Sequence, residues 1–324
     1  MTGLNAEGYP PGLADVGREA RDRNLAQEVR DWTRETTGWF YKKQYENELQ
    51  LYTKQDRDAA YAEVLRLLKK NELIAHHADH GKYRKRYAEI EEIRWQEAAG
   101  VDLPIKWPFH IEEYVKFFPK NSAVIASHPD GGKSGFVFDF VRRNLLAIDD
   151  LRQHFADPFT IHVFDSEKGK EELSERIKRI DDVDIGAWGK YVKFWERSSR
   201  FEDVIHPDAI NVIDYLEIVE NFAEVGKDIK AIHDNLDTGI ALIALQKNWG
   251  ASLGRGGVGS IEKPRLYMTM DRGRLKIEKA KNWRSIEHNP NGMIADFKLV
   301  GGSNFHITRQ LGPEYYEEKR GGRW

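Results

Sequence analysis

The segment 123–136 carries the side chains whose types and order are best suited to chemistry. It reads Ala-Val-Ile-Ala-Ser-His-Pro-Asp-Gly-Gly-Lys-Ser-Gly-Phe, which is an apolar run, a glycine-containing turn, a lysine, a hydroxyl and a helix start. Turn amides and a helix N-terminus offer N–H groups and partial positive charge to an anion. We therefore predict a phosphate-binding loop here; the alternative is an ordinary strand-to-helix turn.

Each residue of this turn has an expected part. Gly131 and Gly132 allow the backbone to close around phosphate. Lys133 would reach the β- and γ-phosphate oxygens, and Ser134 would hold Mg²⁺. One position departs from the usual pattern G-x-x-x-x-G-K-[ST], because Ser127 stands where the first glycine is expected. The predicted nucleotide-binding residues are Asp130, Gly131, Gly132, Lys133, Ser134 and Gly135.

Three later apolar runs each end near a polar side chain, namely Glu167, Asp214 and Gln246. Open α/β sheets bind ligands at the carboxyl ends of their strands, so these side chains should converge with Lys133. Such a set is typical of phosphoryl transfer, in which Mg²⁺ and lysine hold phosphate while a carboxylate orients water.

The order of these motifs resembles that of the RecA-fold ATPases, and within them the DnaB-type replicative helicases and their RepA-like relatives. The resemblance covers about residues 105–310 and rests, beyond the phosphate loop, on the segments 164–176, 214–216 and 244–246. It implies that Glu167 polarises the attacking water, Asp214 supports Mg²⁺ and Gln246 senses the γ-phosphate of ATP.

The same resemblance implies a Lys-x-Arg pair on a late strand that reaches the neighbouring subunit's nucleotide. The best match is Lys279-Ala-Lys281, in which lysine replaces arginine. Arginine makes a forked contact with phosphate whereas lysine acts as a point charge, so hydrolysis in trans is less firmly implied than nucleotide binding. The alternative is that Lys279 and Lys281 line a solvated strand edge.

A glycine-rich segment, 247–260, follows Gln246. Long loops within compact domains are usually functional or mobile. By the resemblance, the central DNA-binding loop lies here, and Lys247, Trp249 and Arg255 would grip a phosphate backbone or stack on a base. The alternative is a flexible surface loop.

The N-terminal part reads as three small helices followed by a two-stranded hairpin, a pattern typical of a winged helix-turn-helix domain, which we place at residues 22–95. The third helix, which Asp56 could cap, would enter the DNA major groove, and the hairpin would contact phosphates. Docking of another protein is the alternative use of such a domain. The predicted DNA contacts are Lys69 on the helix and Lys82, Arg84, Lys85 and Arg86 on the wing.

From residue 121 to 312, apolar runs alternate with helical stretches, which predicts a mostly parallel sheet with helices on both faces. Four later runs, between residues 265 and 308, alternate more and are expected to extend the sheet with antiparallel strands. The remaining segments are predicted to be a flexible arm (1–21), a linker (96–120) and a disordered tail (313–324).

Composition limits the alternatives. The chain has 324 residues, enough for two or three domains, and 40% of them are hydrophobic, which excludes wholesale disorder. It has 50 Lys+Arg and 53 Asp+Glu, a net charge of −3, so affinity for nucleic acid must come from local basic patches. The lack of cysteine excludes thiol chemistry and Cys-ligated metals. With no spanning run and no signal sequence, a soluble, cytoplasmic protein without a membrane partner is expected.

Together these features predict a DNA-dependent ATPase with ATP and Mg²⁺ as cofactors and with DNA and further copies of itself as partners. An oligomeric helicase or motor, as a ring or filament, in replication or recombination of a phage, plasmid or mobile element is the leading hypothesis. The alternatives are a nucleotide-binding, DNA-binding regulator with weak or no turnover, and a recombination mediator.

Overall fold

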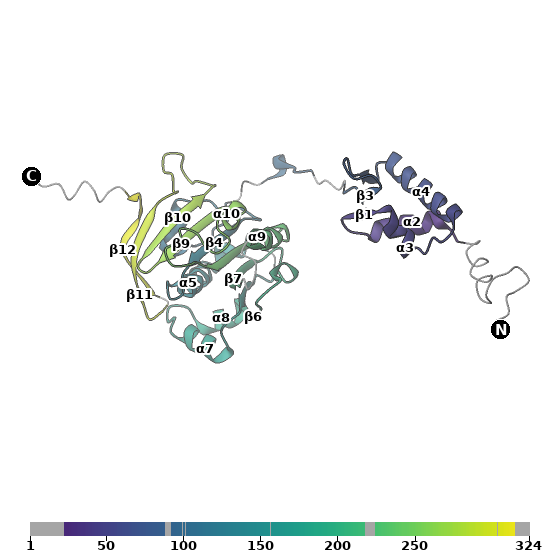
Figure 1. Cartoon of the computed structure of the whole chain (residues 1–324). Helices are drawn as coiled ribbons and strands as arrows, with labels where there is room; N and C mark the ends of the chain where they lie inside the picture. The colour runs from purple at the N-terminus through teal and green to yellow at the C-terminus, as the bar shows by residue number, and fades with distance from the viewer. Residues whose placement is uncertain are drawn as a thin grey trace, which may run out of the picture. The chain divides into compact units, whose positions relative to one another are not determined.

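The computed structural model describes residues 23–87, 92–98, 100, 102–155, 157–217, 224–302 and 304–314. They form two compact units, one ending at Glu97 and the other beginning at Ala98, whose elements are labelled in Figure 1. The predicted arm (1–21) and all but two residues of the predicted tail (313–324) lie outside the described part of the chain.

The described residues of the smaller unit form three α-helices and a three-stranded antiparallel sheet of order β1-β3-β2. In chain order its elements are α2 (Leu25–Glu35), β1 (Trp39–Tyr41), α3 (Lys42–Glu48), α4 (Lys54–Lys69), β2 (Leu73–Ala75) and β3 (Lys82–Lys85). The sequence predicted only the hairpin of β2 and β3, but β1 adds a third strand because Phe40 and Tyr83 pair across it and are both buried in the core. Thr53, and not Asp56, caps α4: its hydroxyl accepts the backbone N–H of Asp56 at 3.1 Å.

The larger unit is built on a nine-stranded sheet of order β12-β11-β10-β9-β4-β8-β7-β5-β6. Its strands are β4 (Ser122–Ser127), β5 (Ile161–Asp165), β6 (Val192–Glu196), β7 (Ile210–Leu216), β8 (Ile240–Gln246), β9 (Leu266–Asp271), β10 (Arg274–Ala280), β11 (Ile294–Val300) and β12 (Asn304–Gly312). The six strands from β9 to β6 are parallel, and β10, β11 and β12 continue the sheet antiparallel.

Two features of this sheet differ from the sequence-based expectation. The run at 265–270 was expected to be antiparallel, but β9 pairs in parallel with β4. The edge strand β6, and the helix α8 (Ile185–Tyr191) before it, were not predicted; the burial pattern of β6 is mostly exposed or half-buried, so its sequence lacks a continuous apolar run.

The sheet is covered on both faces, as expected for parallel strands. One core packs α5 (Lys133–Leu146) and α8 against the sheet, with α7 (Lys170–Lys178) beside them. The opposite core holds α9 (Val225–Asp234) together with the turn η4 (Phe201–Asp203) and the short helix α10 (Val258–Glu262). Among the described residues, none of the helices has the length and apolar content needed to cross a bilayer.

The segment 102–120, predicted as part of a linker, belongs to the larger unit. It places seven side chains in the core: Leu103, Ile105, Trp107, Phe109, Ile111, Val115 and Phe117. The side chain of Asn144 on α5 makes two hydrogen bonds to the backbone of this segment. It accepts the N–H of Lys106 at 3.0 Å and donates to the Lys106 carbonyl at 2.8 Å. Three prolines suggested a linker, but the apolar residues between them are buried in the core of the larger unit.

Acid is expected to weaken the larger unit through His162 on β5. Its ring is 8% exposed, stacks on His206 at 3.5 Å and accepts a hydrogen bond from Trp195 Nε1 at 3.1 Å. Burial, helped by the nearby charges of His206 and Lys193, lowers the pKa of His162 from 6.5 to about 4. Since the unfolded chain takes up this proton at higher pH than the folded one, the free energy of unfolding should fall as pH drops from 6.5 to 4, by up to about 1.4 kcal/mol per pH unit.

The measurement is chemical denaturation across this pH window. His162→Gln removes one titrating group and should reduce the slope, whereas the variant of an exposed histidine, His288→Gln, should keep it. Part of the slope should remain in His162→Gln, because burial also lowers the pKa of His233 to about 4. Equal slopes in all three proteins would show that His162 does not contribute.

Candidate functional site

The phosphate-loop prediction falls on the connection between β4 and α5. All six residues of β4 are buried, and α5 begins directly after Gly132, whose φ of 99° is a conformation that favours glycine. Gly132 is the N-cap of α5 and no side chain caps this end. The first N–H groups of the helix are therefore left for an anion, and they meet it at the positive end of the helix dipole.

Ser127, which replaces the usual first glycine, is accommodated by Gly131. The Ser127 hydroxyl donates to the carbonyl of His128 at 3.1 Å, and a Cβ on residue 131 would lie 2.1 Å from this hydroxyl oxygen. The two positions therefore share one space, in which a side chain at 127 requires a glycine at 131.

Gly131→Ala is expected to distort the loop and to weaken binding of a nucleotide by about tenfold or more, because the Ser127 hydroxyl must leave its position and the His128 carbonyl is also close to the new Cβ. The measurement is a nucleotide titration with thermal unfolding alongside. The double variant Ser127→Gly/Gly131→Ala removes the hydroxyl that causes the overlap and should recover part of both losses. If the double variant behaves like the single one, the shared space is not the cause.

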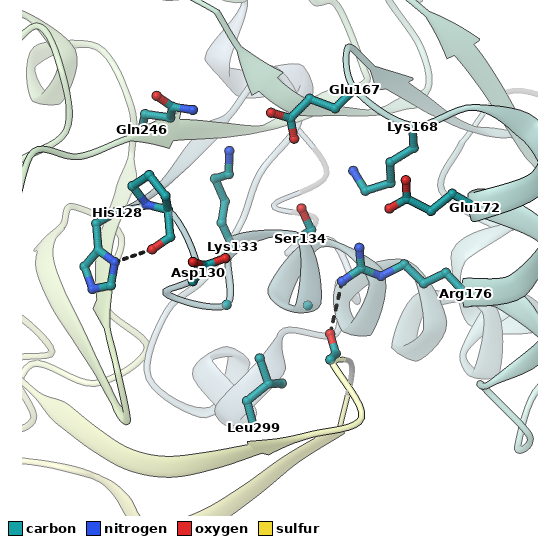
Figure 2. A pocket seen from close by; sticks show the side chains of 14 residues that line it. His128, Asp130, Lys133, Ser134, Glu167, Lys168, Glu172, Arg176, Gln246 and Leu299 are labelled. Atoms are coloured by element: carbon teal, nitrogen blue, oxygen red, sulfur yellow. Dashed lines mark hydrogen bonds between the residues drawn. The ribbon is translucent and has the colours of Figure 1, made fainter.

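A cavity of about 500 Å³ opens beside this loop (Figure 2). Lys133 extends into it from the start of α5 toward Glu167 and Gln246, and Ser134 lies next to it. The cavity is lined by His128, Pro129, Asp130, Gly132, Lys133, Ser134, Gly135, Glu167, Lys168, Glu172, Arg176, Gln246, Leu299 and Gly302. The structure thus brings together side chains that the sequence placed at the ends of β4, β5 and β8.

The side chain of Lys133 is largely buried and lies against an aromatic ring. Its Nζ lies 3.5 Å from the centre of the Tyr215 ring, and burial lowers its pKa to about 8, against the opposing effects of Asp214 and Glu167. A lysine that is costly to keep charged in the empty cavity gains most from an anionic ligand, because the ligand's charge stabilises the ammonium.

An ion cluster that the sequence reading missed lies at the back of this cavity. The ammonium of Lys168 contacts Asp165 Oδ2 at 2.8 Å and Asp214 Oδ2 at 3.0 Å, and all three side chains are at most 5% exposed. Burial acts to lower the pKa of Lys168, but the two carboxylates outweigh it and the net shift is upward. Lys168 therefore stays charged and balances one of the two buried aspartates.

The residues predicted to hold Mg²⁺ meet at the wall of this cavity, which Ser134 lines and behind which Asp214 is buried. Ser134 Oγ donates to Asp214 Oδ1 at 3.4 Å, while the other oxygen of Asp214 faces Lys168. A hydroxyl and a carboxylate are hard oxygen donors, and Mg²⁺ is commonly held by one or two protein oxygens with phosphate and water completing the shell. Ser134 and Asp214 therefore fit this ion.

The turn between β11 and β12 packs onto the start of α5, a contact that the sequence did not reveal. A Cβ on Gly135 would lie 2.9 Å from the carbonyl of Gly302 and 3.4 Å from Leu299. Arg176 of α7 donates to the same Gly302 carbonyl at 3.1 Å, and its guanidinium lies 4.9 Å from the Phe138 ring (Figure 2). Arg176 thereby adds a further cation to Lys133 and Lys168 in the lining of the cavity.

Lys279 and Lys281 do not reach the cavity of their own chain. Lys279 pairs with Tyr267 near the start of β9, whereas the phosphate loop follows the end of the parallel neighbour β4. The ammonium of Lys279 donates to the carbonyls of Ile261 and Glu262 at the end of α10, and Lys281 is exposed. Any contact of these lysines with nucleotide would need a second copy of the chain.

The segment 247–260 runs through turns and bends into the start of α10. Lys247, predicted to contact DNA, is 4% exposed and its ammonium lies 2.8 Å from Asp271, so it is not available for that contact. Trp249 is 68% exposed and stacks on His128 of the phosphate loop, with ring centres 3.9 Å apart. The backbone N–H of Arg255 donates to the Gln246 carbonyl at 2.8 Å.

The predicted DNA contacts of the smaller unit fall in three places. Lys69 is exposed at the end of α4. Lys82 and Arg84 stand on the outer face of the sheet, opposite the buried Tyr83. Lys85 and Arg86 instead line a cavity of about 430 Å³ shared with Arg30 and Arg34 of α2. Strand alternation thus divides the basic run that the sequence treated as one wing.

Comparison with known proteins gives a likeness of fold only. No family model and no curated protein matches the sequence. Among solved structures, a KaiC-like protein from the hyperthermophilic archaeon Pyrococcus horikoshii OT3 is similar at a TM-score of 0.47 and 12% identity, over 64% of this chain and 98% of that one. A RadB recombinase is similar at a TM-score of 0.41 and 11% identity, over 57% and 89% of the two chains. Similarities at this level carry no functional conclusion.

Proposed function

We propose that the protein is a nucleoside triphosphatase that binds ATP with Mg²⁺ in the cavity between β4 and α5 and acts on DNA. The observation that carries the proposal is the meeting of Lys133, Ser134, Glu167 and Gln246 in one cavity beside an uncapped helix N-terminus. A cation, a hydroxyl, a carboxylate and an amide at the carboxyl ends of parallel strands are the groups that hydrolysis of a phosphoanhydride requires.

The residues divide the chemistry among them. The α5 N–H groups and Lys133 would bind and orient the phosphate chain, and Arg176 would add charge at the rim. Glu167 would hold a water in line and take its proton, and Gln246 would donate to the terminal phosphate. Mg²⁺, held by Ser134 and Asp214, would neutralise charge on the phosphate oxygens.

Action on DNA is supported by the exposed segment that follows Gln246. Its backbone returns to Gln246 through Arg255, and Trp249 touches the phosphate loop, so this surface is adjacent to the nucleotide cavity. The element order of the smaller unit, helix-strand-helix-helix-strand-strand, is that of a winged helix, which supports a second DNA contact. Lys279 and Lys281, remote from their own cavity, support an oligomer.

The test is phosphate release from ATP with Mg²⁺, measured alone, with single-stranded DNA and with duplex DNA. Turnover that rises several-fold with DNA is the expected result. Absence of both turnover and ATP binding would overturn the proposal, because the cavity would then not be a nucleotide site.

A second function, a nucleotide-binding DNA regulator with little turnover, is favoured by one observation. Lys168 already neutralises one oxygen of Asp214 at 3.0 Å, which leaves that carboxylate less able to support Mg²⁺. Tight ATP and duplex DNA binding without phosphate release in the same assay would select this function over the motor.

A further inference from the structure

The outer face of the β1-β3-β2 sheet carries aromatic and cationic side chains alternately. Trp39 is 41% and Tyr41 50% exposed, although both lie in regular strand structure. Strand register places Trp39 opposite Arg84 and Tyr41 opposite Lys82. Phe40 and Tyr83 point to the other face and fill the core. Because side chains alternate along a strand, their neighbours on β1 and β3 must lie on the outer face.

The pairs on this face are in direct contact. The Arg84 guanidinium lies 5.2 Å from the Trp39 ring centre, and the Lys82 ammonium lies 5.1 Å from that of Tyr41. His76, just after β2, meets the edge of Trp39 with ring centres 4.9 Å apart. These contacts place a cation over one face of each ring, and the exposure of the two side chains shows that the rest of each ring stays open to solvent.

The charge on the face is mainly positive. Lys82 and Arg84 lie on this face. Lys82 is paired with a carboxylate, because its ammonium donates to Asp79 at 2.8 Å. His76 Nδ1 also lies 3.6 Å from the same carboxylate. The Arg84 guanidinium donates a hydrogen bond to the Lys85 carbonyl, which is neutral, so its positive charge can still attract an anion.

We propose that this face, formed by Trp39, Tyr41, His76, Lys82 and Arg84, is a binding platform for single-stranded nucleic acid. Flat, exposed rings stack on bases, and a stacked base needs a free π-face, which single strands offer and duplexes do not. Trp39 and Tyr41 are two residues apart on one strand, about 7 Å, so each can take one of two successive bases. Lys82 and Arg84 are placed to contact the phosphates between them.

This platform is separate from the duplex contact expected of α4. It rests on the DNA-directed half of the proposed function and is independent of ATP hydrolysis. It assigns single-stranded binding to a surface that carries no residue of the nucleotide cavity, so a failure of the ATPase proposal leaves it standing.

The test uses the full chain without nucleotide and follows the anisotropy of labelled oligothymidine, oligouridine and a duplex at fixed salt. Trp39→Ala/Tyr41→Ala should weaken binding of both single strands by at least about tenfold and change duplex affinity by no more than about twofold. Trp39→Phe/Tyr41→Phe keeps two rings and should restore most of the affinity. Arg84→Gln should lower the dependence of affinity on salt.

The matched control is Tyr52→Ala/Trp95→Ala, which removes two exposed aromatic residues of the same unit that lie outside the sheet face. It should bind like the unmodified chain. To distinguish binding by the platform from binding by the segment 247–260, the variants are repeated in a Trp249→Ala background. The same loss of single-strand affinity is expected there. Normal single-strand binding by Trp39→Ala/Tyr41→Ala, or an equal loss in the control, would overturn the proposal, and in the former case a protein partner for this face would be indicated.

Discussion

Replacing Lys133 by alanine is expected to weaken ATP binding by about 10- to 100-fold, the largest effect on affinity among single substitutions in the cavity. The ammonium is the only side-chain cation that starts from the phosphate loop among the described residues, and Figure 2 shows it directed into the cavity. A hydrogen bond from a charged group contributes about 1.5–3 kcal/mol, which corresponds to this range. Isothermal titration with ATP and Mg²⁺ measures it.

The same substitution should not destabilise the empty protein. Burial lowers the pKa of Lys133 to about 8, which shows that its charge is costly in the folded state. Loss of affinity with an unchanged or higher melting temperature is therefore the expected combination. Lys298→Ala, an exposed lysine on β11, is the control and should leave both values unchanged. Unaltered ATP binding by Lys133→Ala would remove the basis of the proposed function.

Replacing Glu167 by glutamine is expected to reduce phosphate release by about 10²–10⁴-fold while ATP affinity changes by only a few-fold. The amide keeps the size of the side chain and loses its ability to accept a proton from water. Glu167 is exposed toward the cavity, while the nearby Asp165 and Asp214 are both engaged by Lys168. Glu167 is therefore the carboxylate best placed to act on a water.

Glu172→Gln is the matched comparison because Glu172 lines the same cavity from α7. Single-turnover phosphate release should be nearly normal in this variant and strongly reduced in Glu167→Gln. Equal losses would mean that the cavity needs negative charge in general and that Glu167 has no special part.

The parts of the site that could be predicted from the sequence are those set by local order and by strand direction. The β4-loop-α5 unit is contiguous in the sequence, so its residues are sufficient to predict it. Glu167 and Gln246 could be placed because parallel strands end at one edge of a sheet, wherever each strand lies in the order. Both side chains line the same cavity.

The features that were missed depend on contacts between distant segments. Lys168 follows Glu167 directly, but its role arises from the register of β5 against β7, which brings Asp165 opposite Asp214. Arg176 matters because of the β11–β12 turn, 126 residues away. The direction of β9 could not be read from its alternation either, since this strand lies at the boundary of the two kinds of pairing, parallel to β4 on one side and antiparallel to β10 on the other.

The hydrogen bonds that tie the segment 247–260 to the central sheet have a mechanical consequence. Arg255 returns to Gln246 by a backbone hydrogen bond, and the N–H of Gly254 is fixed to the Tyr267 hydroxyl at 3.0 Å. Because the end of this segment is hydrogen-bonded to β8 and to β9, a shift at the tip of β8 would move the base of the segment with it. These hydrogen bonds thereby join the central sheet directly to the surface segment that carries the exposed Trp249.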